Sequence, residues 1–79
     1  MKTFFTHTFK RAAKKLHRNQ VEELEKAIKE IQGEPLIGQL KVGDLAGVRV
    51  HKFRMLHQLI LLAYMFDEGK EELTLLSFA

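Results

Sequence analysis

Ionisable side chains that could act on a phosphate ester are concentrated in one short segment of the chain. Four of them fall between positions 49 and 54, namely Arg49, His51, Lys52 and Arg54, and His57 follows shortly after. RNA can be cleaved without a metal when the 2′-OH attacks the neighbouring phosphate, which requires a proton acceptor, a proton donor and cations that stabilise the phosphate oxygens. His51 or His57 could transfer the protons because imidazole titrates near neutrality. The segment is therefore a candidate catalytic site for RNA cleavage.

The same segment is rich in strand-forming residues and is predicted to be a β-strand. Side chains alternate along a strand, which divides the segment into two sets: Val50, Lys52 and Arg54 on one face, and Arg49, His51 and Phe53 on the other. Neither face is purely apolar, so two explanations stay open. The cations contact phosphates at a rim or cleft, or they pair with acidic residues elsewhere in the chain. A single histidine on a strand is, likewise, more often structural than catalytic.

The charges of the chain are unevenly distributed along the sequence. Residues 1–18 hold six Lys/Arg and no acid, and residues 37–57 hold four Lys/Arg and one acid. If these two blocks converge in space, they would form a basic surface for RNA. The predicted RNA-binding residues are Lys10, Arg11, Lys14, Lys41 and Arg49. The alternative is that the cations are solvated on two unrelated surfaces.

Several other chemistries find no support in the sequence. The chain has no cysteine, and its four histidines lack the i,i+4 spacing of a zinc-protease motif, so no metal site is expected. Ser77 is the only serine and has no nucleophile-elbow glycines beside it. No Gly-rich phosphate-binding loop is present, and no cofactor is expected.

Length and hydropathy predict a single domain over residues 1–79. The longest apolar run, residues 59–66, is far shorter than the roughly 20 residues that span a bilayer. The N-terminus lacks the apolar segment of a signal peptide. We therefore expect a cytoplasmic protein with no membrane partner.

Residue patterns predict one strand and two helices in the first half of the chain. Residues 2–7 read as a strand, and Thr8 can cap a short basic helix over 9–16. Apolar residues then recur at i, i+3 and i+4 spacing after Asn19, a second candidate cap, up to Gly33, which we expect to end the helix in the left-handed conformation.

The second half is predicted to be an irregular connection followed by three strands. The connection contains four apolar side chains that we expect to pack onto the core: Leu36, Ile37, Leu40 and Leu45. The strands are expected over 48–55, 58–66 and 71–78, with Gly69 supplying a positive φ in the last turn. The predicted fold class is α+β: an N-terminal strand, an αα-hairpin and a three-stranded antiparallel meander that form one sheet.

This order of elements, together with five short motifs, resembles the RelE/ParE superfamily of bacterial type II toxins. The motifs are EPLIG at 34–38, LK at 40–41, LAGVR at 45–49, KFR at 52–54 and an apolar strand that contains Tyr64. The resemblance implies a compact toxin that a cognate antitoxin protein holds inactive. Members similar to RelE or YafQ bind the ribosomal A site and cut mRNA without a metal, whereas members similar to ParE inhibit DNA gyrase.

Residues carried over from the resemblance coincide with the candidate site. Lys52 and Arg54 fall on the basic strand positions of the family, and His51 lies near the position where YafQ-like members place a histidine. Gln58 and Leu59 occupy a neighbourhood where members often present an arginine or an aspartate. Members also usually continue past the last strand into a tail with a further histidine, arginine or tyrosine, whereas this sequence ends in LLSFA.

Three functions follow from these observations. We expect a ribosome-dependent mRNA endonuclease that inhibits translation, with the ribosome and mRNA as partners besides the antitoxin. The alternatives are a gyrase inhibitor, and a non-catalytic module that keeps the fold and antitoxin binding. None of the three requires a small-molecule cofactor.

Overall fold

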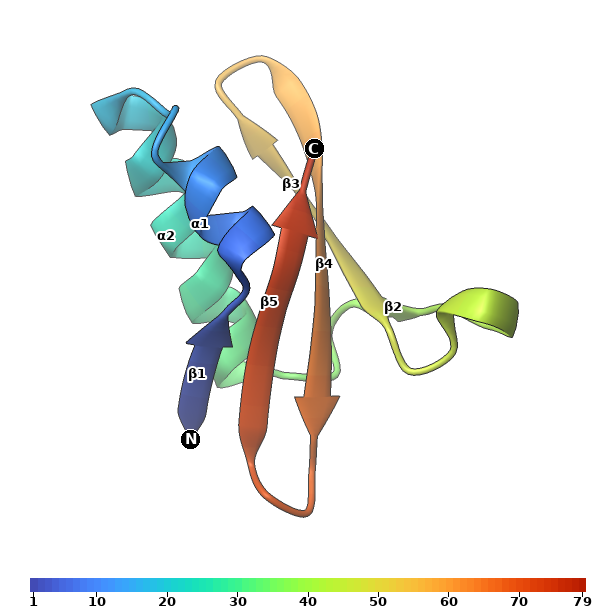
Figure 1. Cartoon of the computed structure of the whole chain (residues 1–79). Coiled ribbons are helices and arrows are strands. Elements are labelled where there is room, and N and C mark those ends of the chain that lie inside the picture. The colour runs from blue at the N-terminus through green and yellow to red at the C-terminus, as the bar shows by residue number, and fades with distance from the viewer.

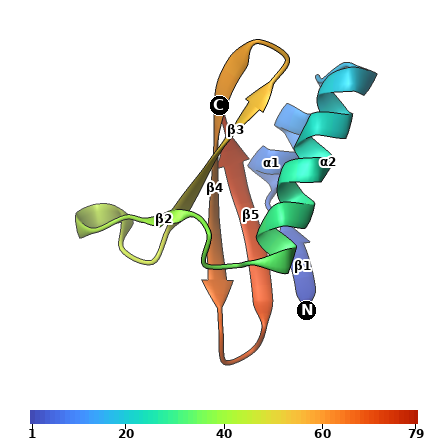
Figure 2. The same ribbon diagram turned by 180° about the vertical axis from the view of Figure 1, so that it is seen from behind.

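The computed structural model describes residues 1–79, with the exception of the side chain of Leu45. Its elements follow one another in the order β1 (Lys2–Phe5), α1 (His7–Ala13), α2 (Arg18–Gly33), β2 (Gln39–Leu40), the 3₁₀ turn η1 (Gly43–Leu45), β3 (Arg49–Met55), β4 (Gln58–Asp67) and β5 (Glu72–Phe78). Both helices pack on the same side of a twisted sheet, and the segment around β2 and η1 extends away from the body (Figures 1 and 2).

The sheet has five strands in the order β1-β5-β4-β3-β2. Strand β1 runs parallel to β5, whereas the other neighbouring pairs are antiparallel. The predicted α+β class, helical hairpin and C-terminal meander are confirmed. The short strand β2, at the edge beside β3, lies within the connection that the sequence predicted to be irregular.

Each helix begins at a cap that local hydrogen bonds define. The hydroxyl of Thr6, two residues before the expected cap, accepts a bond from the Phe9 amide and donates one to the Leu76 carbonyl. Because the Thr6 amide also donates to the Leu75 carbonyl, Thr6 is attached to β5 and α1 starts directly after it. In α2, the His17 amide donates to Oε1 of Gln20 at 2.8 Å, and His17 is the N-cap, which lies before the expected cap at Asn19.

The hydrophobic core lies between the helices and the sheet. Phe9 of α1 and Leu24 and Ile31 of α2 pack against inward-facing side chains of the central strands. The strand residues in this cluster are Met55, Ile60, Leu62, Tyr64, Leu73 and Leu75. Burial of these alternating residues fixes which face of each strand meets the helices.

The other face of the sheet, here called the open face, has no helix over it in either view (Figures 1 and 2). Strand alternation and register place these side chains on it: Lys2 and Phe4 of β1, Val50, Lys52 and Arg54 of β3, Leu59, Leu61, Ala63, Met65 and Asp67 of β4, and Glu72, Thr74 and Ser77 of β5. The expected division of β3 into two sets of side chains is confirmed.

Several local predictions are wrong. Gly33 ends α2 without a positive φ, and the positive φ near the last turn belongs to Glu71, at 52°, instead of Gly69. Leu36, Ile37 and Leu40 are exposed, because the connection extends along the outside of the domain instead of folding back. The predicted packing of Leu45 falls outside the described side chains.

Candidate nucleic-acid interface

Lys52 and Arg54 are exposed neighbours on the open face of β3. They are two positions apart on one face of the strand, so their Cα atoms lie about 7 Å apart. Among the described residues, neither side chain forms an ion pair or a hydrogen bond. Both cations are therefore available to an anionic ligand, and pairing with acids of the chain does not account for them.

Leucines lie directly beside these two cations. In the register of β3 and β4, Lys52 is opposite Leu61 and Arg54 is opposite Leu59. Both leucines are about half exposed, at 44% and 53%. The stems of the two cations can lie along this apolar surface while their charged ends reach solvent.

His57 lies in the turn between β3 and β4, at the same end of the sheet as Arg54. It is exposed and lines a hollow of about 280 Å³ together with Gln20, Leu56 and Gln58. The preceding residue, Leu56, has a φ of +58°, which is a strained conformation for leucine. Because Gln20 belongs to α2, this hollow opens toward the helix side, and His57 shares only its end of the sheet with Arg54.

His51 lies on the opposite face of β3, under α2. It is only 9% exposed, its ring stacks on Phe53 at 6.3 Å between centroids, and its Nε2 lies 3.9 Å from Oε1 of Glu30. Within the described part of the chain, this buried nitrogen has no hydrogen-bond partner. The structure therefore does not bring His51 together with Lys52 and Arg54, and the sheet separates it from any ligand on the open face.

Arg49 holds the connection that follows α2. Its Nη1 donates to the carbonyls of Leu36 (3.2 Å) and Gly38 (2.9 Å). Tyr64, fully buried on the neighbouring strand, donates its hydroxyl proton to the Pro35 carbonyl at 2.7 Å and accepts a bond from the Gly38 amide at 2.9 Å. We call this arrangement of Arg49 and Tyr64 around residues 35–38 the clasp.

The electrostatics of the clasp favour a neutral phenol. Burial raises the pKa of Tyr64 above its usual value, and the hydrogen bond from Gly38 and the charge of Arg49 oppose that shift only in part. Gly38 is required for close approach, because a Cβ at this position would lie 2.7 Å from the Tyr64 hydroxyl. The sequence reasoning missed the clasp and assigned Arg49 to RNA, a role that stays a prediction. The glycine at the end of EPLIG was the available signal.

The remaining predicted RNA-binding residues lie apart from Lys52 and Arg54. Lys10, Arg11 and Lys14 belong to α1 or its C-cap, on the helix side of the sheet. Lys41 follows the edge strand β2 and its amide donates to the Val48 carbonyl. The two basic blocks therefore do not converge on one face of the sheet.

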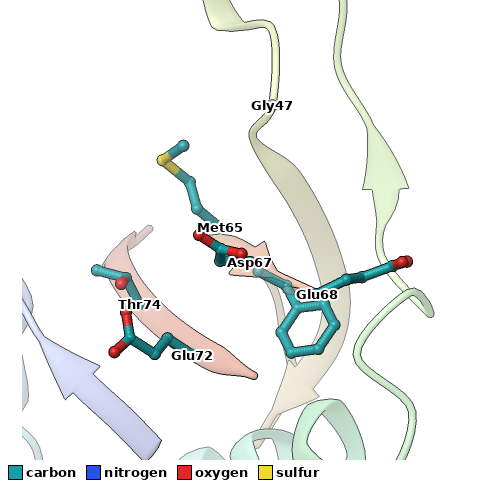
Figure 3. Close-up of a pocket in the computed structure, with 7 residues that line it drawn as sticks. Gly47, Met65, Asp67, Glu68, Glu72 and Thr74 are labelled. Atoms are coloured by element: carbon teal, nitrogen blue, oxygen red, sulfur yellow. The ribbon is translucent and has the colours of Figure 1, made fainter. Parts of the chain in front are cut away.

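A second hollow, of about 530 Å³, opens on the open face at the end opposite the β3–β4 turn (Figure 3). Met65 and Thr74 form part of its wall, and three acidic side chains surround it: Asp67, Glu68 and Glu72. Gly47 lies over it with a φ of +88° and would place a Cβ 3.6 Å from Cε of Met65.

Among the described residues, no three His, Cys, Asp or Glu side chains gather in a way that could hold a metal ion. Neither helix in the described part of the chain combines the length and the apolar character needed to cross a bilayer.

Known structures share this architecture. The alignment with a chain of the intact Escherichia coli RelBE toxin–antitoxin complex covers 99% of this chain and 93% of that one, at 20% identity and a TM-score of 0.78. This chain covers 81% of the isolated E. coli RelE toxin at 20% identity and a TM-score of 0.77. For the RelBE2 toxin–antitoxin complex of Mycobacterium tuberculosis the identity is 25%, the coverage 98% and 93%, and the TM-score 0.75. The domain thus has the fold of RelE toxins.

A sequence comparison makes the assignment more specific. A family model for the ParE-like toxin of type II bacterial toxin–antitoxin systems matches residues 4–79, whereas no curated protein matches the chain. The chain therefore belongs to the ParE-like toxin family and is a RelE/ParE-like toxin of a type II toxin–antitoxin system. The resemblance stated from the sequence is confirmed.

Proposed function

We propose that this toxin is a ribosome-dependent, metal-independent mRNA endonuclease and that Lys52 and Arg54 contact the scissile phosphate. The observation that carries the proposal is the pair of exposed, unpaired cations on the open face. In such a reaction the 2′-OH gives up its proton to a general base as its oxygen attacks the adjacent phosphorus. The bond from phosphorus to the 5′ oxygen breaks, a general acid protonates that oxygen, and a 2′,3′-cyclic phosphate remains. The two cations would stabilise the charge that develops on the phosphate oxygens.

In this proposal, His57 protonates the leaving 5′ oxygen. It is exposed at the end of the hairpin that carries Arg54, whereas His51 is buried on the other side of the sheet. The proposal therefore assigns proton transfer to His57 and a packing role to His51. Ribosome-dependent cleavage would also place the protein in the cytoplasm.

An antitoxin is the proposed partner that controls the activity. The related structures include toxin–antitoxin complexes, and one contains an E. coli RelE mutant with an antitoxin peptide. Leu59 and Leu61 beside the cations give such a partner an apolar surface to bury.

Cleavage in a translation extract tests the proposal. Wild-type protein should cut mRNA only when ribosomes are present, and Lys52→Ala/Arg54→Ala should lower the cleavage rate by about 100-fold or more, since each cation stabilises the transition state. Both side chains are exposed, so the melting temperature should stay nearly constant. Intact mRNA at high wild-type concentration would contradict the proposal.

Gyrase inhibition is the second candidate, because the matching family model describes a ParE-like toxin. A supercoiling assay distinguishes the two functions. Under the first proposal gyrase activity is unchanged at protein concentrations that cleave mRNA, and under the second only supercoiling is inhibited.

A further inference from the structure

The open face carries apolar side chains along its middle that nothing in the chain covers. Leu59, Leu61 and Met65 of the central strand β4 are 53%, 44% and 43% exposed. In α+β domains an apolar sheet face is normally buried against another layer, and exposed apolar patches on soluble proteins commonly mark binding surfaces.

Charges of opposite sign flank this apolar strip. Arg54 and Lys52 lie beside Leu59 and Leu61, and no acidic residue occurs between positions 45 and 66. At the other end, Asp67 is paired in register with Glu72. Glu68 lines the same hollow of about 530 Å³ as these two residues (Figure 3). Lys2 of β1 is paired in register with Glu72 and is a cation at this acidic end. Eight residues of β4 separate the two ends, a distance of about 26 Å.

We propose that the open face binds a second copy of this chain in a two-fold symmetric dimer. The axis lies between the two sheets and across their strands, so the strands of the two copies run in opposite directions. The open-face residues of β4 are 59, 61, 63, 65 and 67, which places the axis at Ala63. Leu61 of each copy then lies opposite Met65 of the other, with a small side chain at the centre.

The same symmetry brings opposite charges together. The end of the strip that carries Arg54 and Leu59 in one copy lies opposite the end that carries Asp67 and Glu72 in the other. A two-fold axis repeats every contact, so both ends of the interface are matched at once. Sheets packed face to face lie about 10 Å apart, and long arginine and lysine side chains bridge that gap.

This self-complementarity favours a second copy over an unrelated protein as the occupant. A face that binds only an acidic ligand needs no carboxylates at its far end. A face that pairs with itself across a two-fold axis needs positive and negative side chains at equal distances from that axis. The dimer covers Lys52 and Arg54 of both copies. Self-association would therefore compete with any anionic ligand of those two residues, and with the antitoxin proposed above to bury Leu59 and Leu61, whichever function the toxin has.

Sedimentation equilibrium with two complementary variants tests the proposal. Wild-type protein should form a species of twice the 9.2 kDa mass of one chain at concentrations up to about 1 mM. Lys52→Glu/Arg54→Glu makes both ends negative, and Asp67→Lys/Glu72→Lys makes both ends positive. Each variant alone should dimerise at least about tenfold more weakly, and an equimolar mixture should recover the dimer to within about threefold.

Lys15→Glu/Lys29→Glu is the matched control, because it makes the same charge change at exposed residues on the helix side. It should leave the dimer intact. Far-UV circular dichroism checks that each variant folds; if a charge variant does not, Leu61→Arg tests the same face at one exposed position. A wild-type monomer at every concentration would overturn the proposal and leave the face to a different protein. A wild-type dimer with a monomeric mixture would place the interface elsewhere and also overturn it.

Discussion

Replacing Tyr64 by phenylalanine should destabilise the toxin by about 2–4 kcal/mol. The ring is fully buried and phenylalanine retains it, so the change removes only the hydroxyl. That hydroxyl donates to the Pro35 carbonyl and accepts from the buried Gly38 amide. The two bonds contribute about 0.5–1.5 kcal/mol each, and the buried Gly38 amide that is left without a partner costs about 1 kcal/mol more, at the lower end of its usual range.

This loss is a large part of the stability expected for a domain of 79 residues. At roughly 0.05–0.15 kcal/mol per residue, the free energy of unfolding is about 4–12 kcal/mol. A domain of this size loses about 4–8 °C in melting temperature per kcal/mol, so the Tyr64→Phe variant should melt about 8–32 °C lower. The amide of Gly38 should also exchange with solvent faster, because the clasp no longer protects it.

Urea denaturation followed by far-UV circular dichroism measures the effect. Ser77→Ala is a suitable control, since it too removes a hydroxyl from a strand residue, and the half-buried Ser77 makes no side-chain hydrogen bond among the described residues. The control should change the free energy of unfolding by less than about 0.5 kcal/mol. If Tyr64→Phe costs no more than the control, the clasp does not stabilise the fold and the reasoning is refuted.

Three further predictions concern backbone geometry and ionisation. The pKa of Tyr64 is raised in the folded state, so its stabilisation is complete below about pH 10 and is lost as the pH rises through the folded pKa. As the only tyrosine, it can be titrated by tyrosinate absorbance, and unfolding in urea should return the pKa to the usual value; an identical pKa in both states would contradict the assigned burial. Gly38→Ala should cost about 1–3 kcal/mol in thermal or urea unfolding, because its Cβ would lie 2.7 Å from the Tyr64 hydroxyl and 2.8 Å from Cε1 of the same ring. In a Tyr64→Phe background the cost should fall only in part, since the ring carbon remains; an unchanged cost would show that the hydroxyl adds nothing to the strain. Leu56→Gly should stabilise the protein by about 0.5–1 kcal/mol, because glycine adopts a positive φ without strain and the leucine side chain is half exposed. A lower melting temperature would show that the packing of the Leu56 side chain stabilises the protein more than its positive φ destabilises it.

The sequence predicted the secondary structure well, because strong local patterns determine it. Alternation in β3, β4 and β5 and helical spacing in α2 gave boundaries within about two residues of those observed. The helix caps were displaced because Thr6 and Thr8 are equally good candidates locally. The choice between them depends on the bonds of Thr6 to β5, more than 60 residues away in the chain.

The candidate site was harder to predict because β3 carries polar residues on both faces. Alternation separates His51 from Lys52, but it does not say which of them faces the helices. That choice follows from long-range contacts: Arg49 holds the connection after α2, and His51 packs under Glu30. Local sequence contains neither contact.

The two faces of β3 therefore allow stability and activity to be separated experimentally. Lys52 and Arg54 make no contact that the fold needs among the described residues, so a loss of toxicity in their variants reports on the ligand. Arg49 and His51 lie on the other face, where substitution disturbs the clasp or the packing under α2. A loss of toxicity in Arg49 variants is thus evidence for RNA contact only if their free energy of unfolding is unchanged. Of the cations on this strand, Arg49 holds the connection after α2, whereas Lys52 and Arg54 are assigned to a ligand by proposal only.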